Sequence, residues 1–313
     1  MMMVLKMVDK SSPKVIALTL NWNGRLHTLE CLKSLQESTY PHDVIVVDNA
    51  SADDSVNLIN RYFPKVQLVL NDKNLGYSGG YNEGIKEAVS RGFDYLLILN
   101  NDTQIHKNSI KELVNLAESV DKVGAVTGKV YHYSDRKRFQ YIGGRKKNRF
   151  GLLSSPRGAN QVDRGQFDKT MEVENTDDVF FLVSKEVIDS VGTYSPLFFL
   201  YYEETDWCER MIRKGYKLMY THKAKIWHKG SVSTGGGTNP KKLYWYTRNG
   251  FIFAKRNYGF FLSALFLFNE FLIKLPRSVI VFIIKSKYNL FKPFISGQLS
   301  GLKAFLLVKE LSD

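Results

Sequence analysis

The sequence has little cysteine and no uncharged run of membrane-spanning length in its apolar C-terminal part. Two cysteines, Cys31 and Cys208, are too few for a disulfide framework, so we expect reduced thiols in a cytoplasmic protein. The longest uncharged stretch after residue 244 is 257–269, which is shorter than the roughly 20 residues that span a bilayer. Residues 1–13 lack the apolar core of a signal peptide, and we expect them to form a leader.

Acidic residues are also in deficit. The 313 residues include 31 acidic and 44 basic side chains, for a formal net charge of +13. Such a surplus indicates an anionic partner, which could be nucleic acid, anionic lipid or a phosphorylated substrate. The sequence contains no recognition helix or RNA-binding motif, and part of the surplus lies in the apolar C-terminal part. We therefore expect no nucleic-acid partner.

Strand-like and helix-like segments alternate from residue 15 to residue 119. Apolar runs typical of strands buried on both faces are each followed by a segment with helical spacing or a helix-start signal. This alternation predicts an α/β fold with a doubly wound, mostly parallel sheet. The strand-like runs are residues 15–20, 43–51, 66–72 and 95–102.

Polar side chains follow each of these strands. In doubly wound sheets, ligands bind at the carboxyl ends of the strands, so these side chains should converge on one site for a polar ligand. The alternative for any single strand end is an ordinary Asx-type turn. The residues concerned are Asn21, Asp48, Asn49, residues 71–74, Asn100, Asn101 and Asp102.

Three carboxylates stand at the start of a predicted helix over residues 203–214. Acidic residues favour helix N-termini, and Asp206 with Arg210 makes an i,i+4 pair. That explanation does not account for Glu203 and Glu204 directly after the apolar residues 198–202. Close like charges raise the pKa of a carboxylate, which suits a general base.

The tail, residues 244–313, is rich in Phe, Leu and Ile and is interrupted by Lys and Arg. Basic residues mixed with large apolar ones predict amphipathic helices that lie in a membrane interface. The alternatives are a packed C-terminal helical hairpin and a contact within a homo-oligomer.

Several motifs occur together in the order seen in one enzyme family. They are LTLNWNG, VIVVDNASADDS, NLGYSGGYNEG, LILNNDT, FFLYYEETDWCERMIRKGYKL and AKIWHKGSVS. Over residues 15–258 the chain resembles family 2 glycosyltransferases, most closely the rhamnosyltransferase-like and galactofuranosyltransferase-like branch. The resemblance implies a single GT-A domain over residues 14–243, with a nucleotide-binding half (14–122) and an acceptor half (123–243).

The resemblance also implies roles for the polar strand ends. Asp48 matches the carboxylate that accepts from the N3–H of uracil or thymine, with Asn21, Asn49 and Asp53 in the same loop set. Asn74 and Gly79 fall in the motif that approaches the ribose and the sugar diphosphate.

Two further matches concern the metal and the base. Asp102 matches the last aspartate of the metal-binding DxD motif, and Asn100 stands where that motif has its first aspartate. Asparagine is a weaker, neutral ligand, so we expect a lower metal affinity, for which His228 compensates. Asn100 and Asn101 are expected to hydrogen-bond sugar or ribose hydroxyls. His228 matches a histidine that reaches the metal or diphosphate; the alternative is an interior histidine. Glu204 matches the catalytic base, with Glu203 and Asp206 as alternatives.

Together these matches predict an inverting glycosyltransferase that uses Mn²⁺ or Mg²⁺ and a UDP- or dTDP-sugar. Its acceptor would be a glycan or a polyprenyl-diphosphate-linked sugar, at the inner face of the cell membrane. The alternatives are an inactive sugar-nucleotide-binding protein and a nucleotidyltransferase. A nucleotidyltransferase would have a glycine- and arginine-rich loop after the first strand, and this sequence lacks that loop.

Overall fold

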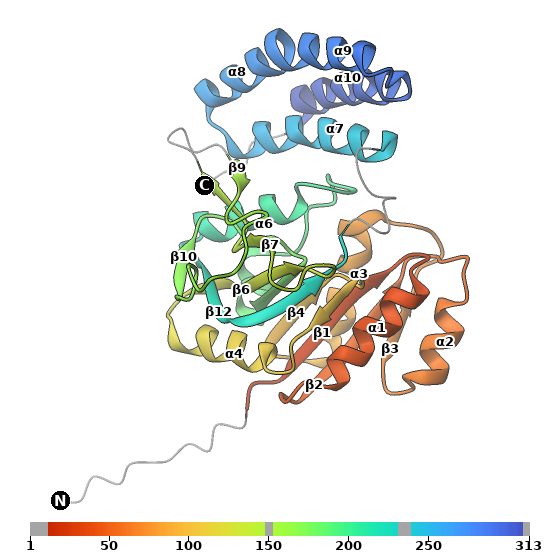
Figure 1. Ribbon diagram of the computed structural model, residues 1–313, viewed down its shortest axis with the longest axis vertical. Coiled ribbons are helices and arrows are strands. Elements are labelled where there is room, and N and C mark those ends of the chain that lie inside the picture. Colours follow the sequence, from red (N-terminus) through yellow and green to blue (C-terminus); the bar gives the residue numbers. More distant parts are fainter. Residues whose placement is uncertain (1–11, 148–152, 231–238, 309–313) are drawn as a thin grey trace, which may run out of the picture.

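The computed structural model describes residues 12–147, 153–230 and 239–308 (Figure 1). The expected leader falls almost wholly outside these residues. In Figure 1 a central sheet with helices around it lies below a separate layer of C-terminal helices.

Four parallel strands form the first half of the sheet, in the spatial order β4-β1-β2-β3. They are β1 (Val15–Asn21), β2 (His42–Asp48), β3 (Gln67–Leu70) and β4 (Tyr95–Leu99). The helices that follow them along the chain are α1 (Arg25–Gln36), α2 (Ser55–Tyr62), α3 (Gly76–Arg91) and α4 (Ser109–Ser119). The predicted alternation is confirmed, because each apolar run became a strand and each periodic segment a helix.

The second half extends the same sheet to ten strands, in which β11 runs antiparallel between β4 and β6. Its strands are β5 (Thr103–Ile105), β6 (Val123–His132), β7 (Phe139–Ile142), β10 (Met171–Val173), β11 (Phe180–Ser184) and β12 (Lys217–His228). A separate two-stranded ribbon contains β8 (Arg145–Lys147) and β9 (Leu153–Pro156), and the helices are α5 (Lys185–Val191) and α6 (Glu203–Arg213).

The sheet is buried on both faces, which explains why its strands read as continuous apolar runs. Successive residues of a strand point to opposite faces. In β1, Ile16 and Leu18 pack into one hydrophobic cluster, and Val15 and Ala17 pack into the other. The helices on each face therefore cover the sheet and leave its carboxyl edge for a site.

The tail forms a layer of helices stacked on the sheet domain (Figure 1). Its segments are α7 (Pro240–Asn257), α8 (Phe260–Phe268), a π-helical turn (Asn269–Lys274), α9 (Leu275–Ile284), a 3₁₀ turn (Tyr288–Leu290) and α10 (Phe291–Leu307). The boundary expected after residue 243 falls in the first turns of α7, since this helix starts at Pro240. Among the described residues, none of the helices has the length and apolar character needed to cross a membrane.

Candidate active site

A cavity of about 950 Å³ opens at the carboxyl edge of the sheet. Its size is that of a cofactor or substrate pocket. The residues around it come from both halves of the sheet domain and, through Lys242, from α7. Its polar lining includes Asn49, Asn74, Asn100, Asn101, Asp102, Gln140, Asp177, Asp178, Glu203, Glu204, His228 and Lys229.

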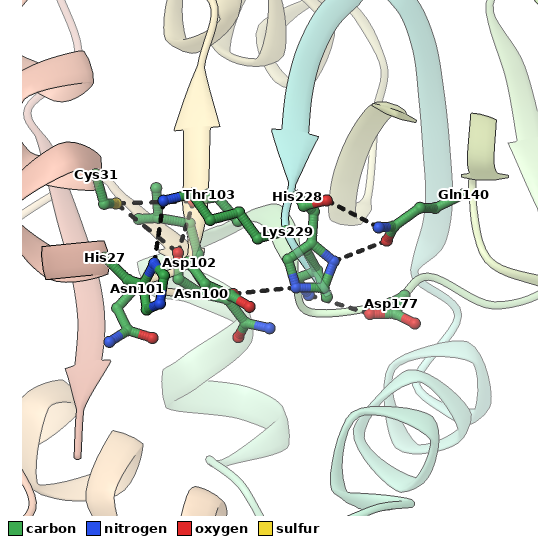
Figure 2. A network of polar contacts seen from close by, with 12 residues as sticks. His27, Cys31, Asn100, Asn101, Asp102, Thr103, Gln140, Asp177, His228 and Lys229 are labelled. Atoms are coloured by element: carbon green, nitrogen blue, oxygen red, sulfur yellow. Dashed lines mark hydrogen bonds and ion pairs between the residues drawn. The ribbon is translucent and has the colours of Figure 1, made fainter. Parts of the chain in front are cut away.

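Asp102 and His228 meet in this cavity although they are far apart in the sequence. Strand β5 begins immediately after Asp102 and pairs antiparallel with the end of β12, with Thr103 opposite His228. As a result, Asp102 Oδ1 lies 3.0 Å from His228 Nε2 (Figure 2). Both residues are less than a tenth exposed. The strand pairing therefore fixes the spacing of a carboxylate and an imidazole.

Gln140 determines which tautomer His228 adopts, and therefore whether the nitrogen that faces Asp102 carries a proton. The Gln140 amide donates from Nε2 to the His228 carbonyl oxygen at 2.9 Å, which leaves its Oε1 facing His228 Nδ1 at 2.7 Å (Figure 2). Nδ1 must therefore carry a proton and donate to Oε1. In the neutral imidazole, Nε2 then has only a lone pair, and it faces a carboxylate oxygen.

Two acceptors at this separation repel each other unless a positive charge lies with them. Either a second proton on the ring or a divalent cation between the two groups supplies that charge. Burial acts to raise the pKa of Asp102, but the hydrogen bond and charge of His228 outweigh it, so this pKa lies below its usual value. Asp102 is thus held as a carboxylate, and the pair fits a metal such as Mn²⁺ or Mg²⁺.

The remaining ligands of such a metal would come from substrate and water. No cluster of three His, Cys, Asp or Glu side chains suitable for a metal occurs among residues 12–147, 153–230 and 239–308. The Asn100 amide oxygen accepts a hydrogen bond from Tyr77 Oη at 3.0 Å, so it is already engaged. Magnesium-type sites commonly combine one or two protein ligands with substrate phosphates.

Glu203 and Glu204 also line the cavity, at the start of α6. Burial, and then the charge of Asp177, raise the pKa of Glu204 to about 7. Burial, and then the charge of Glu204, raise the pKa of Glu203 well above its usual value. Glu203 Oε2 is buried without a hydrogen-bond partner in the described residues. Glu204 is therefore the carboxylate poised to exchange a proton near neutral pH.

Asp177 and Asp178 are cavity residues that the sequence reasoning missed. They lie one residue before β11, which runs antiparallel to β4, so the start of β11 lies beside the end of β4. Asn100 N accordingly donates to the Val179 carbonyl oxygen at 3.1 Å. Burial, and then the charges of Glu204 and Glu203, raise the pKa of Asp178 well above its usual value. The sequence signal was an acidic pair directly before an apolar run. The pair could be placed at the cavity only if the direction of β11 in the sheet were known.

Asn49 and Asn74 line the cavity and also shape the turn before α3. Asn49 Nδ2 donates to Asn74 Oδ1 at 3.1 Å and to the Gly76 carbonyl oxygen at 3.0 Å. Asn49 Oδ1 accepts from Leu75 N at 3.0 Å. Asn101 is tied in a similar way, since its Nδ2 donates to Thr28 Oγ1 at 2.9 Å. These asparagines therefore build the cavity wall.

Asn21 and Asp48 pair with each other behind the cavity lining. Asn21 Nδ2 donates to Asp48 Oδ1 at 2.7 Å, and Ser51 N donates to Asp48 Oδ2 at 2.9 Å. Both side chains are less than a twentieth exposed. Trp22, which follows Asn21, is 38% exposed and lines the cavity. Recognition of a base edge by Asp48 remains a prediction.

Two predicted donor-binding residues lie elsewhere. Asp53 accepts from Arg25 N at 3.2 Å and from the Ser55 backbone and hydroxyl, so it stabilises the turn before α2. Gly79 packs inside α3, where an added Cβ would lie 2.8 Å from Leu75 Cβ. Neither residue is part of the cavity lining, as is also true of Asn21 and Asp48, so their roles in donor binding remain predictions.

The structure also argues against Asp206 as the base. Asp206 is fully buried, with Arg210 Nε at 3.0 Å and Arg256 Nε at 2.8 Å from its two oxygens. Asn257 Nδ2 donates to it as well, at 3.2 Å. The oxygens of a carboxylate bound by two guanidinium groups are engaged there, and Asp206 is not part of the cavity lining. Asp206 therefore links α6 to α7.

Comparison with known proteins agrees with the motifs. The family model described as "Glycosyl transferase family 2" matches residues 19–191. The dTDP-rhamnosyl transferase RfbF of Shigella flexneri is 25% identical over 303 residues, which cover 92% of this chain and 95% of that protein. The N-acetylglucosaminyl-diphospho-decaprenol L-rhamnosyltransferase of Mycobacterium tuberculosis is 25% identical over 227 residues, or 67% of this chain and 74% of that protein.

Solved structures share the fold at low sequence identity. TarS 1-349 of S. aureus in complex with UDP-GlcNAc has a TM-score of 0.60 at 15% identity and covers 93% of this chain and 81% of its own. The mannosyltransferase PcManGT of Pyrobaculum calidifontis with GDP-Man and Mn²⁺ has a TM-score of 0.53 at 13% identity, covering 94% and 88%. GalNAc-T7 with UDP, GalNAc and Mn²⁺ has a TM-score of 0.61 at 16% identity; the match covers 84% of this chain and 55% of that one. These likenesses confirm the predicted GT-A fold.

Proposed function

We propose, from the premise that this chain belongs to glycosyltransferase family 2 and to its rhamnosyltransferase-like branch, that it transfers a hexosyl group with inversion. The donor is a dTDP- or UDP-sugar, and the acceptor is a hydroxyl of a glycan or of a polyprenyl-diphosphate-linked sugar. The observation that carries the proposal is that one cavity contains both the Asp102–His228 pair and Glu204.

Asp102 and His228 hold the divalent cation in this proposal. When bound, Mn²⁺ or Mg²⁺ neutralises charge on the donor diphosphate and acts as a Lewis acid. Asp102 supplies a carboxylate oxygen, and His228 supplies the lone pair of Nε2, because Gln140 fixes the tautomer with the proton on Nδ1. In this proposal the asparagines of the cavity wall face the donor, and Lys229, which is ion-paired with Glu30, lies beside the diphosphate site.

Glu204 acts as the base. Its carboxylate accepts the proton of the acceptor hydroxyl while that oxygen forms a bond to the anomeric carbon. The bond from the anomeric carbon to the diphosphate breaks on the opposite side, so the configuration inverts and the nucleoside diphosphate leaves with the electron pair. Glu203 remains the alternative base, and its Oε2 is buried beside Glu204 without a hydrogen-bond partner in the described residues.

The tail places the enzyme at the inner face of the cell membrane in this proposal. Large apolar side chains of α8 and α9 are exposed, including Phe260 at 91%, Phe261 at 73% and Ile284 at 75%. From residue 258 to 308 the chain has six Lys or Arg and one acidic residue, Glu270, which is buried beside Lys274. An apolar face flanked by cations matches the interface of an anionic bilayer, where a lipid-linked acceptor resides.

A donor screen tests the enzymatic proposal. Thermal shift with dTDP-rhamnose, other dTDP-sugars and UDP-sugars, each with and without Mn²⁺, identifies the donor, because a ligand of the native state raises its apparent stability. Transfer to a lipid-linked acceptor is then measured, with the anomeric configuration of the product read by NMR. Glu204→Gln should lower kcat by about 100-fold or more while it leaves donor binding unchanged. Donor binding without transfer by the wild type would indicate an inactive binding protein instead.

A further inference from the structure

The glutamates of the cavity follow a turn with an unusual backbone. Residues 197–202, called here the pre-α6 turn, end in Tyr201 and Tyr202, whose φ angles are 73° and 75°. Left-handed conformations are disfavoured for residues with a Cβ, and two in succession persist only where the surroundings determine them. Tyr202 is the N-cap of α6, so its conformation sets the direction in which Glu203 and Glu204 leave the turn.

Helix α7 of the tail supplies one part of those surroundings. Asn249 is completely buried, and its Nδ2 donates to the Leu200 carbonyl oxygen at 2.9 Å and to the Tyr201 carbonyl oxygen at 3.0 Å. Arg248 Nη1 donates to Asn249 Oδ1 at 2.7 Å and to the Leu197 carbonyl oxygen at 3.1 Å. The guanidinium group therefore orients the amide so that its two N–H groups face the turn.

Helix α3 of the nucleotide-binding half holds the same turn from the other side. Tyr77 N donates to the Phe199 carbonyl oxygen at 2.7 Å. Gly76 has a φ of +76°, and a Cβ on it would lie 2.4 Å from that same carbonyl oxygen. The pre-α6 turn is thus fixed between the donor side of the cavity and the tail.

We propose that Asn249 is a positioning residue for sugar transfer, which acts through the two backbone carbonyls that it binds. It holds Tyr201 and Tyr202 in their left-handed conformations, and these aim the following glutamates into the cavity. This inference rests on the proposed function, since it assigns Asn249 to the placement of the base. Through Asn249, helix α7 of the tail then contributes to the geometry of the active site.

Asn249→Asp tests the proposal with nearly the same side-chain volume. The variant replaces both N–H donors with an oxygen that repels the two carbonyls. The matched control is Thr247→Val on the same helix, because Thr247 is 2% exposed and its hydroxyl has no partner in the described residues. Kinetic constants, melting temperature, and hydrogen exchange of a peptide covering residues 197–204 are measured for each variant.

Asn249→Asp should lower kcat by about tenfold or more and shift the pH midpoint of kcat, with the donor KM changed by less than about twofold. Exchange in the 197–204 peptide should rise, and Thr247→Val should match the wild type. Arg248→Met, which removes only the group that orients the amide, should give a smaller change in the same direction and covers the case in which Asn249→Asp does not fold.

The proposal is overturned if exchange rises without loss of kcat, or if Thr247→Val loses as much kcat as Asn249→Asp. An equal loss of donor binding would assign the effect to the whole cavity and also overturn it. If the wild type transfers no sugar at all, the proposed function fails separately, and the exchange data alone decide whether Asn249 holds the turn.

Discussion

Glu204 combines partial burial with the neighbouring charge of Asp177, and together they raise its pKa to about 7. The base must be ionised to accept a proton, so kcat should rise with pH through about 7 and level off above it. Measurement of kcat between pH 5 and 9 with saturating donor and metal checks this expectation. A kcat already constant from pH 5 upward would contradict Glu204 as the titrating base.

The same raised pKa has a consequence for stability. The folded state binds a proton at Glu204 more tightly than the unfolded chain, so Glu204 contributes stability below its unfolded pKa of 4.5 that is lost as pH rises through about 7. Glu204→Gln cannot ionise, and at pH 8 it should be more stable than the wild type by roughly 1–3 kcal/mol. At pH 4 the two proteins should unfold alike. Urea unfolding at both pH values measures the difference, and equal stabilities at pH 8 would contradict the burial argument.

Gln140 touches no proposed substrate group, yet it orients His228. Loss of such a partner typically weakens metal binding by about 10–100-fold, so Gln140→Leu should raise the Mn²⁺ concentration for half-maximal activity by about tenfold. Gln104→Leu is the control, since Gln104 lies on β5 but outside the cavity lining. Titration of Mn²⁺ by electron paramagnetic resonance gives the affinity directly. Unchanged affinity in Gln140→Leu would contradict the assigned tautomer.

At the scale of elements, the contact between α6 and α7 depends on a buried ion pair. Asp206 is fully buried, and the Arg256 side chain that binds it is 12% exposed. Arg256→Ala leaves part of that buried charge uncompensated and should lower the free energy of unfolding by about 3–5 kcal/mol. Lys185→Ala breaks the exposed pair with Asp189 and should cost less than about 1 kcal/mol. Urea denaturation compares the two, and equal losses would contradict the structural importance of this link.

The strands and helices of the first half could be predicted because their signals are local. Burial of the sheet on both faces produces continuous apolar runs, and the polar residues that end β1, β2 and β4 converge as parallel strands require. Asp177 and Asp178 could not be placed, because an apolar run such as β11 does not reveal its direction in the sheet. Strand direction is set by distant pairing partners.

Motif matching also could not separate residues that line the cavity from residues that build it. Asp53 and Asp206 have the right chemistry and position, but their oxygens are taken by Arg25 and Ser55 in one case and by two arginines in the other. In α3, Gly76 lines the cavity and Gly79 does not. The residue at which the helix begins determines which of its positions face the cavity. Such distinctions follow from side-chain packing.

At the scale of the whole molecule, the exposed apolar face of α8 and α9 predicts a measurable preference for anionic lipid. Phe260→Ser with Phe261→Ser removes two aromatic rings that are 91% and 73% exposed. The double variant should bind phosphatidylglycerol-containing vesicles at least about tenfold more weakly, because each ring would bury a large apolar area in the interface. Co-sedimentation measures the binding.

Leu70→Ser is the control for this experiment, since Leu70 is 60% exposed at the end of β3 on the sheet domain. It should leave vesicle binding unchanged, and neither variant should alter the melting temperature by much. Equal binding by the double variant and the wild type would contradict the assigned face. A change in sedimentation mass without lipid would assign the face to self-association.

The pairing of β5 with β12 sets an order of events during protein synthesis. Strands β1, β2 and β4 and the following Asp102 are synthesised before β12, so β5 can form its pairing only after β12 and its last residue, His228, have been synthesised. A nascent chain that ends before His228 lacks the Asp102–His228 pair. A chain that ends before Glu203 also lacks the proposed base. A site assembled from both strands is therefore complete only after β12 has been synthesised and has paired with β5.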